Sequence, residues 1–228
     1  MYKSADEFAS AGTNCAAPTE SSYSDQMQLF PGNEADTNDM WLLFHDGSAD
    51  ELSLKTYDDS ADSWSEASIA TGMTEATVAS FMPQIGGSIR LSDGHLIAAM
   101  NNLTDDAAAD LRVWDINGAG SITEKTNVVT NSDDRGLAGV FIDQSSGTIF
   151  VSYLGKADGS DTWSSALNVC YKTSTDGGAN WSSETCVNSS AASTAAALYT
   201  GLGGTCSLFL PVWWDSTLAD LFENPSTA

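Results

Sequence analysis

One segment, Ser174–Trp181, constrains the fold of this chain more than any other. It reads S-x-D-x-G-x-x-W and lies between two runs that favour β-strands, Ala166–Lys172 and Ser183–Val187. Its serine and aspartate side chains can bond the backbone of a turn, and its two adjacent glycines can adopt positive φ at low cost. Its tryptophan leaves the turn with a large apolar surface to bury. The segment therefore predicts a β-hairpin turn whose last residue enters a core.

Short β-rich runs separated by Gly, Asp, Asn and Ser recur in a fixed order along the chain. They form four units: Met27–Phe30, Trp41–Phe44, Leu52–Tyr57 and Ser63–Ile69; Ser88–Leu91, His95–Met100, Leu111–Trp114 and Ile122–Val129; Gly139–Asp143, Thr148–Tyr153, Ala166–Lys172 and Ser183–Val187; Ala196–Thr200, Ser207–Trp214 and Leu218–Phe222. The aspartates assigned to the corresponding turns, Asp58, Asp115 and Asp176, are about 60 residues apart, which suits a four-stranded propeller blade. We therefore expect an all-β chain, a β-propeller of about four blades with four-stranded antiparallel sheets.

The motif at Ser174, Asp176, Gly178 and Trp181 resembles the Asp-box, or BNR repeat, of sialidase-like β-propellers. In that family the box is a structural turn between the third and fourth strands of a blade. The resemblance covers most of residues 23–222 as a repeat pattern, but only this box matches cleanly. The segment Tyr57–Trp64 is similar to a degraded box with one extra residue before its tryptophan.

The fourth unit lacks an outermost strand, which leaves two interpretations of residues 1–22. This N-terminal segment can supply the missing strand and close the ring of the propeller domain at 23–228. Alternatively, the four units form an arc that another chain or a further segment completes. Two open sheet edges would favour aggregation, so closure within one chain is the preferred prediction.

Four cysteines bear on both the hairpin and the closure. Cys170 and Cys186 are symmetric about Gly178, so an antiparallel hairpin centred there would place them opposite each other, within reach of a disulfide. The alternative is two buried free thiols. Cys15 and Cys206 would be the remaining pair and would clasp the N-terminal segment to the last blade. No C-x-x-C motif occurs, and two disulfides would indicate an oxidising environment.

The sialidase resemblance implies three arginines that clamp a carboxylate, a Tyr–Glu nucleophile pair, an Asp acid/base and six blades. This chain has three arginines in total, Arg90, Arg112 and Arg135. Arg90 belongs to an expected inner strand, Arg135 immediately precedes the inner strand of the next unit, and both are possible ligand contacts. Arg112 belongs to a third strand, far from the axis. Local salt bridges are the alternative for each. No G-x-S-x-G elbow accompanies the two histidines, so we expect no catalytic residues.

Two further kinds of binding residue stand out. Trp163, in a long polar loop, is a possible ligand contact. Acidic loops offer weak Ca²⁺ candidates without the spacing of a known calcium motif, at Asp46 with Asp50 and Glu51, at Asp105 with Asp106 and Asp110, and at Asp158 with Asp161. We otherwise expect no cofactor and no metal.

The charge of the chain restricts the classes of partner that it is expected to bind. A net charge of −23 repels nucleic acid and anionic membranes, and no apolar run is long enough to span a bilayer. The N-terminus lacks the hydrophobic core of a signal peptide, so the chain is not exported by that route, is a mature or partial product, or belongs to a virion. We expect a non-catalytic recognition or structural module that binds glycan or protein outside the cell, on a cell surface or on a virus particle. A sialidase-like glycoside hydrolase with an atypical site and a structural subunit of a larger assembly are the alternatives.

Overall fold

The structure is a computed structural model of the 228-residue chain. It describes residues 2–3, 13–14, 23–32, 39–73, 85–101, 111–117, 121–129, 136–155, 168–187, 195–200, 208–209, 211–215, 220–223 and 226–227. Side chains are described for 27–32, 39–73, 85–100, 111–117, 121–129, 138–155 and 168–187. Within these ranges there is no helix, and accordingly none that could cross a membrane.

Three four-stranded antiparallel sheets follow one another along the chain, each with its strands in sequence order. Blade 1 consists of β3 (Tyr23–Pro31), β4 (Met40–Asp46), β5 (Glu51–Asp58) and β6 (Ser63–Thr71). Blade 2 consists of β7 (Ile85–Arg90), β8 (His95–Asn101), β9 (Leu111–Asn117) and β10 (Ser121–Glu124). Blade 3 consists of β11 (Gly136–Ile142), β12 (Ile149–Leu154), β13 (Val169–Ser174) and β14 (Thr185–Cys186).

A fourth sheet has three strands in the part of the chain that the structure describes. Blade 4 consists of β15 (Ala195–Thr200), β17 (Pro211–Asp215) and β18 (Asp220–Glu223). Two short pairs complete the strand list, β1 (Tyr2–Lys3) with β2 (Thr13–Asn14) and β16 (Leu208–Phe209) with β19 (Ser226–Thr227). In the described residues β1 pairs with β2, and the closure of the ring by 1–22 stays a prediction.

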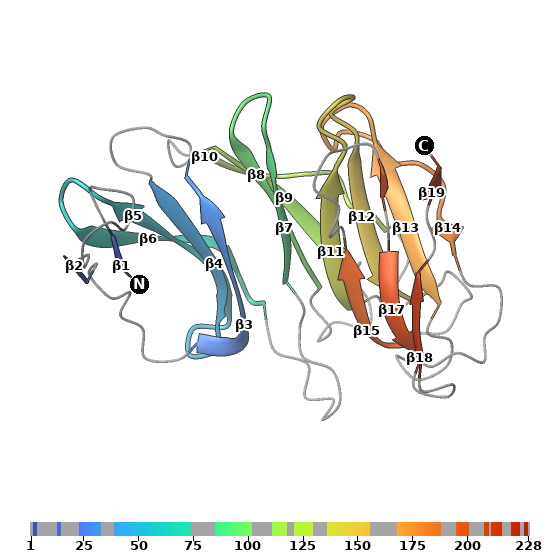
Figure 1. The fold of residues 1–228 in the computed structure, drawn as a ribbon, viewed down its shortest axis with the longest axis horizontal. Helices are drawn as coiled ribbons and strands as arrows, with labels where there is room; N and C mark the ends of the chain where they lie inside the picture. Colours follow the sequence, from blue (N-terminus) through green and yellow to red (C-terminus); the bar gives the residue numbers. More distant parts are fainter. Residues whose placement is uncertain are drawn as a thin grey trace.

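The sheets are arranged as the blades of a propeller. Blades 1, 2 and 3 stand side by side and blade 4 follows blade 3 (Figure 1). The first strands of neighbouring blades contact each other, β3 with β7, β7 with β11, and β11 with β15. These inner strands therefore lie toward one axis, and the later strands of each blade lie toward the outside. The expected all-β propeller of about four blades is confirmed.

The core lies between blades rather than within one sheet. The seam between blades 1 and 2 buries apolar side chains from both sheets, among them Trp41, Leu43, Leu54, Leu96 and Trp114. The seam between blades 2 and 3 buries Ile97, Val113, Val140, Val151 and Tyr153. This arrangement explains the spacing of the apolar residues in the sequence. Successive side chains of a strand point to opposite faces of the sheet, so every second residue looks into a seam.

Two glycines of β7 allow the inner strands to approach closely. A Cβ built on Gly86 would lie 2.6 Å from the Cα of Gly139 in β11, and one on Gly87 would lie 2.5 Å from the ring of Phe30 in β3. A side chain at either position would push blade 2 away from its neighbours. The sequence Gly86-Gly87 therefore sets the spacing of three blades near the axis.

Two predicted elements differ from the observed ones. The run Ile122–Val129 was expected to be one strand, but β10 ends at Glu124, and the residues after it cross toward blade 3. Asp115 was assigned to a turn, but it lies inside β9 and is buried. In both places a charged side chain, Lys125 or Asp115, contacts residues of other segments. Secondary-structure propensity does not take such contacts into account.

Candidate functional site at the seam of blades 2 and 3

The hairpin turn between β13 and β14 is built by the polar residues of the motif. The buried Ser174 Oγ accepts a hydrogen bond from the Gly178 amide at 2.8 Å and donates to Asp176 Oδ1 at 2.8 Å. Asp176 also accepts from the Asn180 amide at 2.9 Å and from the Asn180 side chain at 2.7 Å. The side-chain and backbone hydrogen bonds from Asn180, together with the one from Ser174, lower the pKa of Asp176 to about 2. The turn therefore contains a carboxylate that stays ionised in all but strong acid.

Two glycines let the turn meet the neighbouring blade. Gly177 and Gly178 have φ angles of 72° and 89°, which L side chains rarely adopt. A Cβ at Gly178 would lie 2.8 Å from Cγ of Lys125 in the segment after β10, whereas one at Gly177 would meet nothing within 4 Å. Gly178 is therefore required for its backbone conformation and for contact with blade 2.

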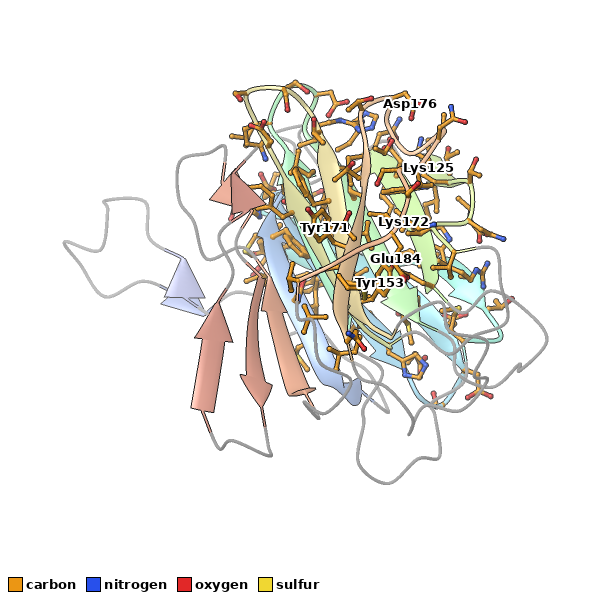
Figure 2. All side chains as sticks on the ribbon, turned by 90° about the vertical axis from the view of Figure 1, so that its right-hand side faces the viewer. Lys125, Tyr153, Tyr171, Lys172, Asp176 and Glu184 are labelled. Atoms are coloured by element: carbon orange, nitrogen blue, oxygen red, sulfur yellow. A yellow bond between two sulfur atoms is a disulfide. The ribbon has the colours of Figure 1, made fainter. Side chains whose placement is uncertain are left out.

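Trp181 extends the same contact. Its indole Nε1 donates to the Thr126 carbonyl of blade 2 at 2.9 Å, and its ring packs against the apolar seam of blades 2 and 3. Figure 2 shows Asp176 and Lys125 near one end of the blades, with Tyr153 and Glu184 farther along. The hairpin is thus an inter-blade contact as well as a turn.

A charged cluster surrounds Asp115 on the same seam. The Asp115 carboxylate lies 3.1 Å from Arg90, 2.6 Å from His95 Nδ1 and 3.2 Å from Lys125 Nζ. Burial alone would raise the pKa of Asp115, but hydrogen bonds from His95 and Lys125 and the charges of Arg90 and Lys125 outweigh it and lower the pKa. One buried carboxylate therefore ties the β7–β8 hairpin to β9 and to the segment after β10.

Arg90 is held inside this cluster. It donates through Nε and a terminal nitrogen to Asp93, with an ion-pair distance of 2.7 Å, and its side chain is 13% exposed. The hydrogen bonds that Arg90 donates to Asp93 raise the pKa of Arg90 despite partial burial, and Asp115 adds to the effect. The Arg90 guanidinium therefore makes a local salt bridge, which was the alternative to a role as a ligand contact.

Arg112 also makes a local pair. It lies on β9, the third strand of blade 2, where the sequence placed it, and it contacts Glu124 at 2.8 Å and the ring of Trp114. Arg135, Trp163, Cys15 and Cys206 lie outside the described residues. Their predicted roles as ligand contacts or as a second disulfide stay predictions.

The two cysteines of the hairpin meet as predicted. Cys170 is directly opposite Cys186, with a Cα–Cα distance of 4.0 Å, and their sulfurs form a disulfide. Beside it Tyr153 donates to Glu184 at 2.9 Å, and the tyrosine is fully buried. A Tyr–Glu pair therefore exists, but it lies within the seam and its phenol is closed to a substrate.

Blade 1 holds a candidate cation-binding group. Carboxylate oxygens of Asp46, Glu51 and Glu66 all lie within 4.8 Å of one another. However, Lys55 is 2.8 Å from Glu66, and Asp46 accepts the hydroxyl and the backbone N–H of Ser48, which lowers its pKa. The candidates at Asp105, Asp106 and Asp110 and at Asp158 and Asp161 lie outside the described residues.

Sequence reasoning missed three contributors to this seam: His95, Lys125 and Gln144. Arg90 and His95 flank a short turn and are opposite each other in the β7–β8 register, which a hairpin argument can predict. Gln144 in the β11–β12 turn donates to the Ile89 carbonyl and accepts from the Leu91 amide, each at 2.8 Å. No sequence signal indicates the contacts of Gln144 with Ile89 and Leu91 or of Lys125 with Gly178, because they join different blades.

Comparisons with known proteins find structural similarity only. No protein-family model matches the chain, and no curated protein matches it. An N-acetylgalactosamine deacetylase from F. plautii, solved with blood group B trisaccharide, is similar at 10% identity with a TM-score of 0.56, covering 93% of this chain and 70% of that one. An α-L-arabinofuranosidase from Fusarium graminearum, solved with an iminosugar inhibitor, is similar at 17% identity with a TM-score of 0.55, covering 87% and 60%.

An exo-β-1,3-galactanase from Clostridium thermocellum has a TM-score of 0.51 at 12% identity, covering 89% of this chain and 46% of that enzyme. This chain thus spans about half to 70% of the lengths of these three proteins. At such low identities the similarity concerns the fold.

Proposed function

We propose that this chain is a non-catalytic recognition module that binds glycan or protein outside the cell. The observation that carries the proposal is the state of Arg90. Its guanidinium is engaged by Asp93 and Asp115 rather than presented to a ligand. Tyr153 of the Tyr153–Glu184 pair is likewise buried between blades, and Glu184 is half-buried. The described residues that most resemble catalytic groups therefore serve the packing of the propeller.

Glycan is the preferred ligand class. The three similar structures are named for a deacetylase of an amino sugar, an arabinofuranosidase and a galactanase. A propeller directs loops from every blade toward one centre, which suits recognition of an extended ligand. Fold similarity is an analogy rather than a site argument, so binding itself has to be measured.

We also infer that the Ser174–Trp181 turn is an Asp-box of the sialidase-like kind. The hydrogen bonds of Ser174 and Asp176 and the inward Trp181 support this assignment. The Cys170–Cys186 disulfide supports an oxidising location, such as the cell exterior, a cell surface or a virus particle.

The test combines binding and turnover on the same protein preparation. The chain is applied to an array of sialylated, galactosylated, arabinosylated and N-acetylgalactosaminylated glycans and to matching fluorogenic glycosides. We expect selective binding to an array member without release of fluorophore. Turnover that Arg90→Ala abolishes and Arg112→Ala preserves would overturn the proposal. Absence of binding to every glycan would reject the glycan assignment.

The main alternative is a glycoside hydrolase with an atypical site, favoured by the two glycosidases among the similar folds. A second alternative is a structural subunit of a larger assembly. It is favoured by blade 4, in which the described residues form three strands, and by Met27 and Leu29 on β3, which are 51% and 49% exposed. A mass measurement in solution separates a closed monomer from an assembly, because an arc needs a second chain to cover its open faces.

A further inference from the structure

Three side chains that can bind a metal ion meet at the disulfide of blade 3. Ligand atoms of Cys170, Glu184 and Cys186 all lie within 4.8 Å of one another. The Cys186 sulfur is 3.8 Å from one Glu184 carboxylate oxygen. Thiolates and carboxylates both bind Zn²⁺, and thiolates select it over Mg²⁺ and Ca²⁺. The group therefore has the donor atoms of a zinc site once its two sulfurs are no longer bonded to each other.

The strand register holds these donors on one face of the sheet. Tyr153 on β12, Cys170 on β13 and Cys186 on β14 are paired in a single row. Glu184 belongs to the same face, because its carboxylate accepts a hydrogen bond from Tyr153. The Cα atoms of the two cysteines are 4.0 Å apart. A tetrahedral zinc ion keeps two sulfurs roughly 3.8 Å apart, which rotation of the cysteine side chains can supply while the strands stay in place.

Glu184 is already oriented toward the sulfurs. The hydroxyl of the fully buried Tyr153 donates to Glu184 Oε2 at 2.9 Å, and Glu184 Oε1 is the oxygen near Cys186. Carboxylates that bind metal ions usually accept a hydrogen bond of this kind, which fixes their orientation and raises the affinity. Lys172 follows Cys170 by two residues and adds one positive charge to this part of the blade (Figure 2). Two thiolates and one carboxylate exceed that charge, so the group attracts a divalent cation.

The outer edge of blade 3 gives an ion access to the group. Strand β14 has two residues and is the last strand of its sheet among the described residues. Cys170 is fully buried, whereas Glu184 and Cys186 are half-buried. An ion bound by these three residues would therefore have its fourth position on the half-buried side, where water completes a tetrahedron.

We propose that Cys170, Cys186 and Glu184 bind Zn²⁺ when the hairpin disulfide is reduced, with Tyr153 as the residue that orients Glu184. A dithiol reductant gives two electrons and two protons to the disulfide and itself becomes a cyclic disulfide. The two thiols that form release their protons when they bind the ion. The hairpin is then linked by a disulfide in an oxidising environment and by zinc in a reducing one. This inference does not rest on the proposed glycan binding.

The test uses Co²⁺ as the probe, because Co²⁺ bound to thiolates has charge-transfer bands in the near ultraviolet. The full chain is reduced with dithiothreitol, separated from it without oxygen, and titrated with Co²⁺. We expect these bands to saturate at one equivalent in the reduced chain and to be absent from the oxidised chain, and we expect Zn²⁺ to displace Co²⁺. The double variant Cys15→Ser with Cys206→Ser is expected to keep the bands, since neither residue belongs to the group.

Variants of the reduced chain identify the ligands. Cys186→Ser removes one thiolate, and we expect the bands to be lost. Glu184→Gln keeps an acceptor for Tyr153 but removes the carboxylate, and we expect roughly tenfold weaker Co²⁺ binding. Glu124→Gln on β10 of blade 2 is the matched control, for which we expect unchanged binding.

Amide hydrogen exchange adds a measurement that does not depend on the bands. Reduction removes the cross-link on β14, and we expect Zn²⁺ to slow exchange at residues 185–187 of the reduced chain. Absence of the bands, bands retained by Cys186→Ser, undiminished binding by Glu184→Gln, or exchange at 185–187 that Zn²⁺ leaves unchanged would each overturn the proposal.

Discussion

Asp176 is the residue on which the hairpin turn depends most directly, because both of its carboxylate oxygens accept hydrogen bonds from Asn180. The Ser174 hydroxyl also stabilises the turn, because it donates to Asp176 and accepts from the Gly178 amide. These contacts favour the ionised carboxylate, and they lower its pKa from 3.8 to about 2. A single side chain therefore couples the turn to pH.

The folded pKa of Asp176 is depressed, so its stabilising contribution is complete above about pH 4 and is lost as the pH falls toward 2. We expect Asp176→Asn to flatten the dependence of the unfolding free energy on pH in this window. Chemical denaturation at a series of pH values measures it, and Thr175→Ala serves as a control. An Asp176 carboxyl that titrates near 3.8 by NMR would contradict the prediction.

At the scale of elements, the hairpin of β13 and β14 is defined as much by blade 2 as by its own turn. Gly178 lies against Lys125, and Trp181 bonds Thr126. Strand β14 itself has only two residues, so backbone pairing alone holds it weakly. The seam contacts and the disulfide supply the rest.

Paired substitutions separate the turn conformation from the seam contact. Gly177→Ala forces a side chain to positive φ in open space, and we expect a loss of about 1 kcal/mol of unfolding free energy. Gly178→Ala adds a clash with Lys125, so we expect a further loss of about 1–3 kcal/mol. Urea unfolding of both variants checks the difference, and equal losses would show that the seam contact carries no energy.

The disulfide makes a separate contribution to the same element. Replacing Cys170 and Cys186 with Ala removes a cross-link over a sequence separation of 16 residues. We expect the unfolding free energy to fall by about 3 kcal/mol, since the unfolded chain regains the entropy of the open loop. We also expect faster amide exchange at 181–187 than in β10. Free thiols found at these cysteines by non-reducing peptide mapping would contradict the assignment.

At the scale of the whole molecule, a net charge of −23 is spread over a chain with few cations to offset it. Among the described residues, Arg90, Arg112, Lys55 and Lys125 each face a carboxylate. The remaining acidic groups repel one another across the surface, and dissolved salt screens that repulsion. The folded chain is therefore expected to depend on ionic strength.

We expect the melting temperature to rise by a few degrees when NaCl increases from dilute to physiological strength and beyond. The reason is that screening relieves repulsion between surface carboxylates more than it weakens the partly buried pairs around Asp115. Thermal scans at fixed pH measure the effect, with sucrose as an uncharged control. We expect the rise of the melting temperature with salt to be smaller at pH 4. A melting temperature that falls with salt would contradict the prediction.

The repeat of short strands and the hairpin turn were predictable because they follow from local chemistry. Alternating apolar residues, turn residues and the symmetry of Cys170 and Cys186 about Gly178 all act within one blade, where neighbours in sequence are neighbours in space. The strand order, the all-β class and the disulfide could therefore be derived from the amino-acid sequence.

The seams between blades could not be derived in this way. The contact of Gly178 with Lys125 and the hydrogen bonds of Gln144 with Ile89 and Leu91 join residues whose approach depends on how whole sheets pack. The partners of Arg90 and Asp115 lie on other strands of the same sheet, so they are set by the strand register, whereas Gly178 meets Lys125 across two sheets. Packing between sheets is a long-range property, so the tertiary structure is needed to assign these residues to the scaffold.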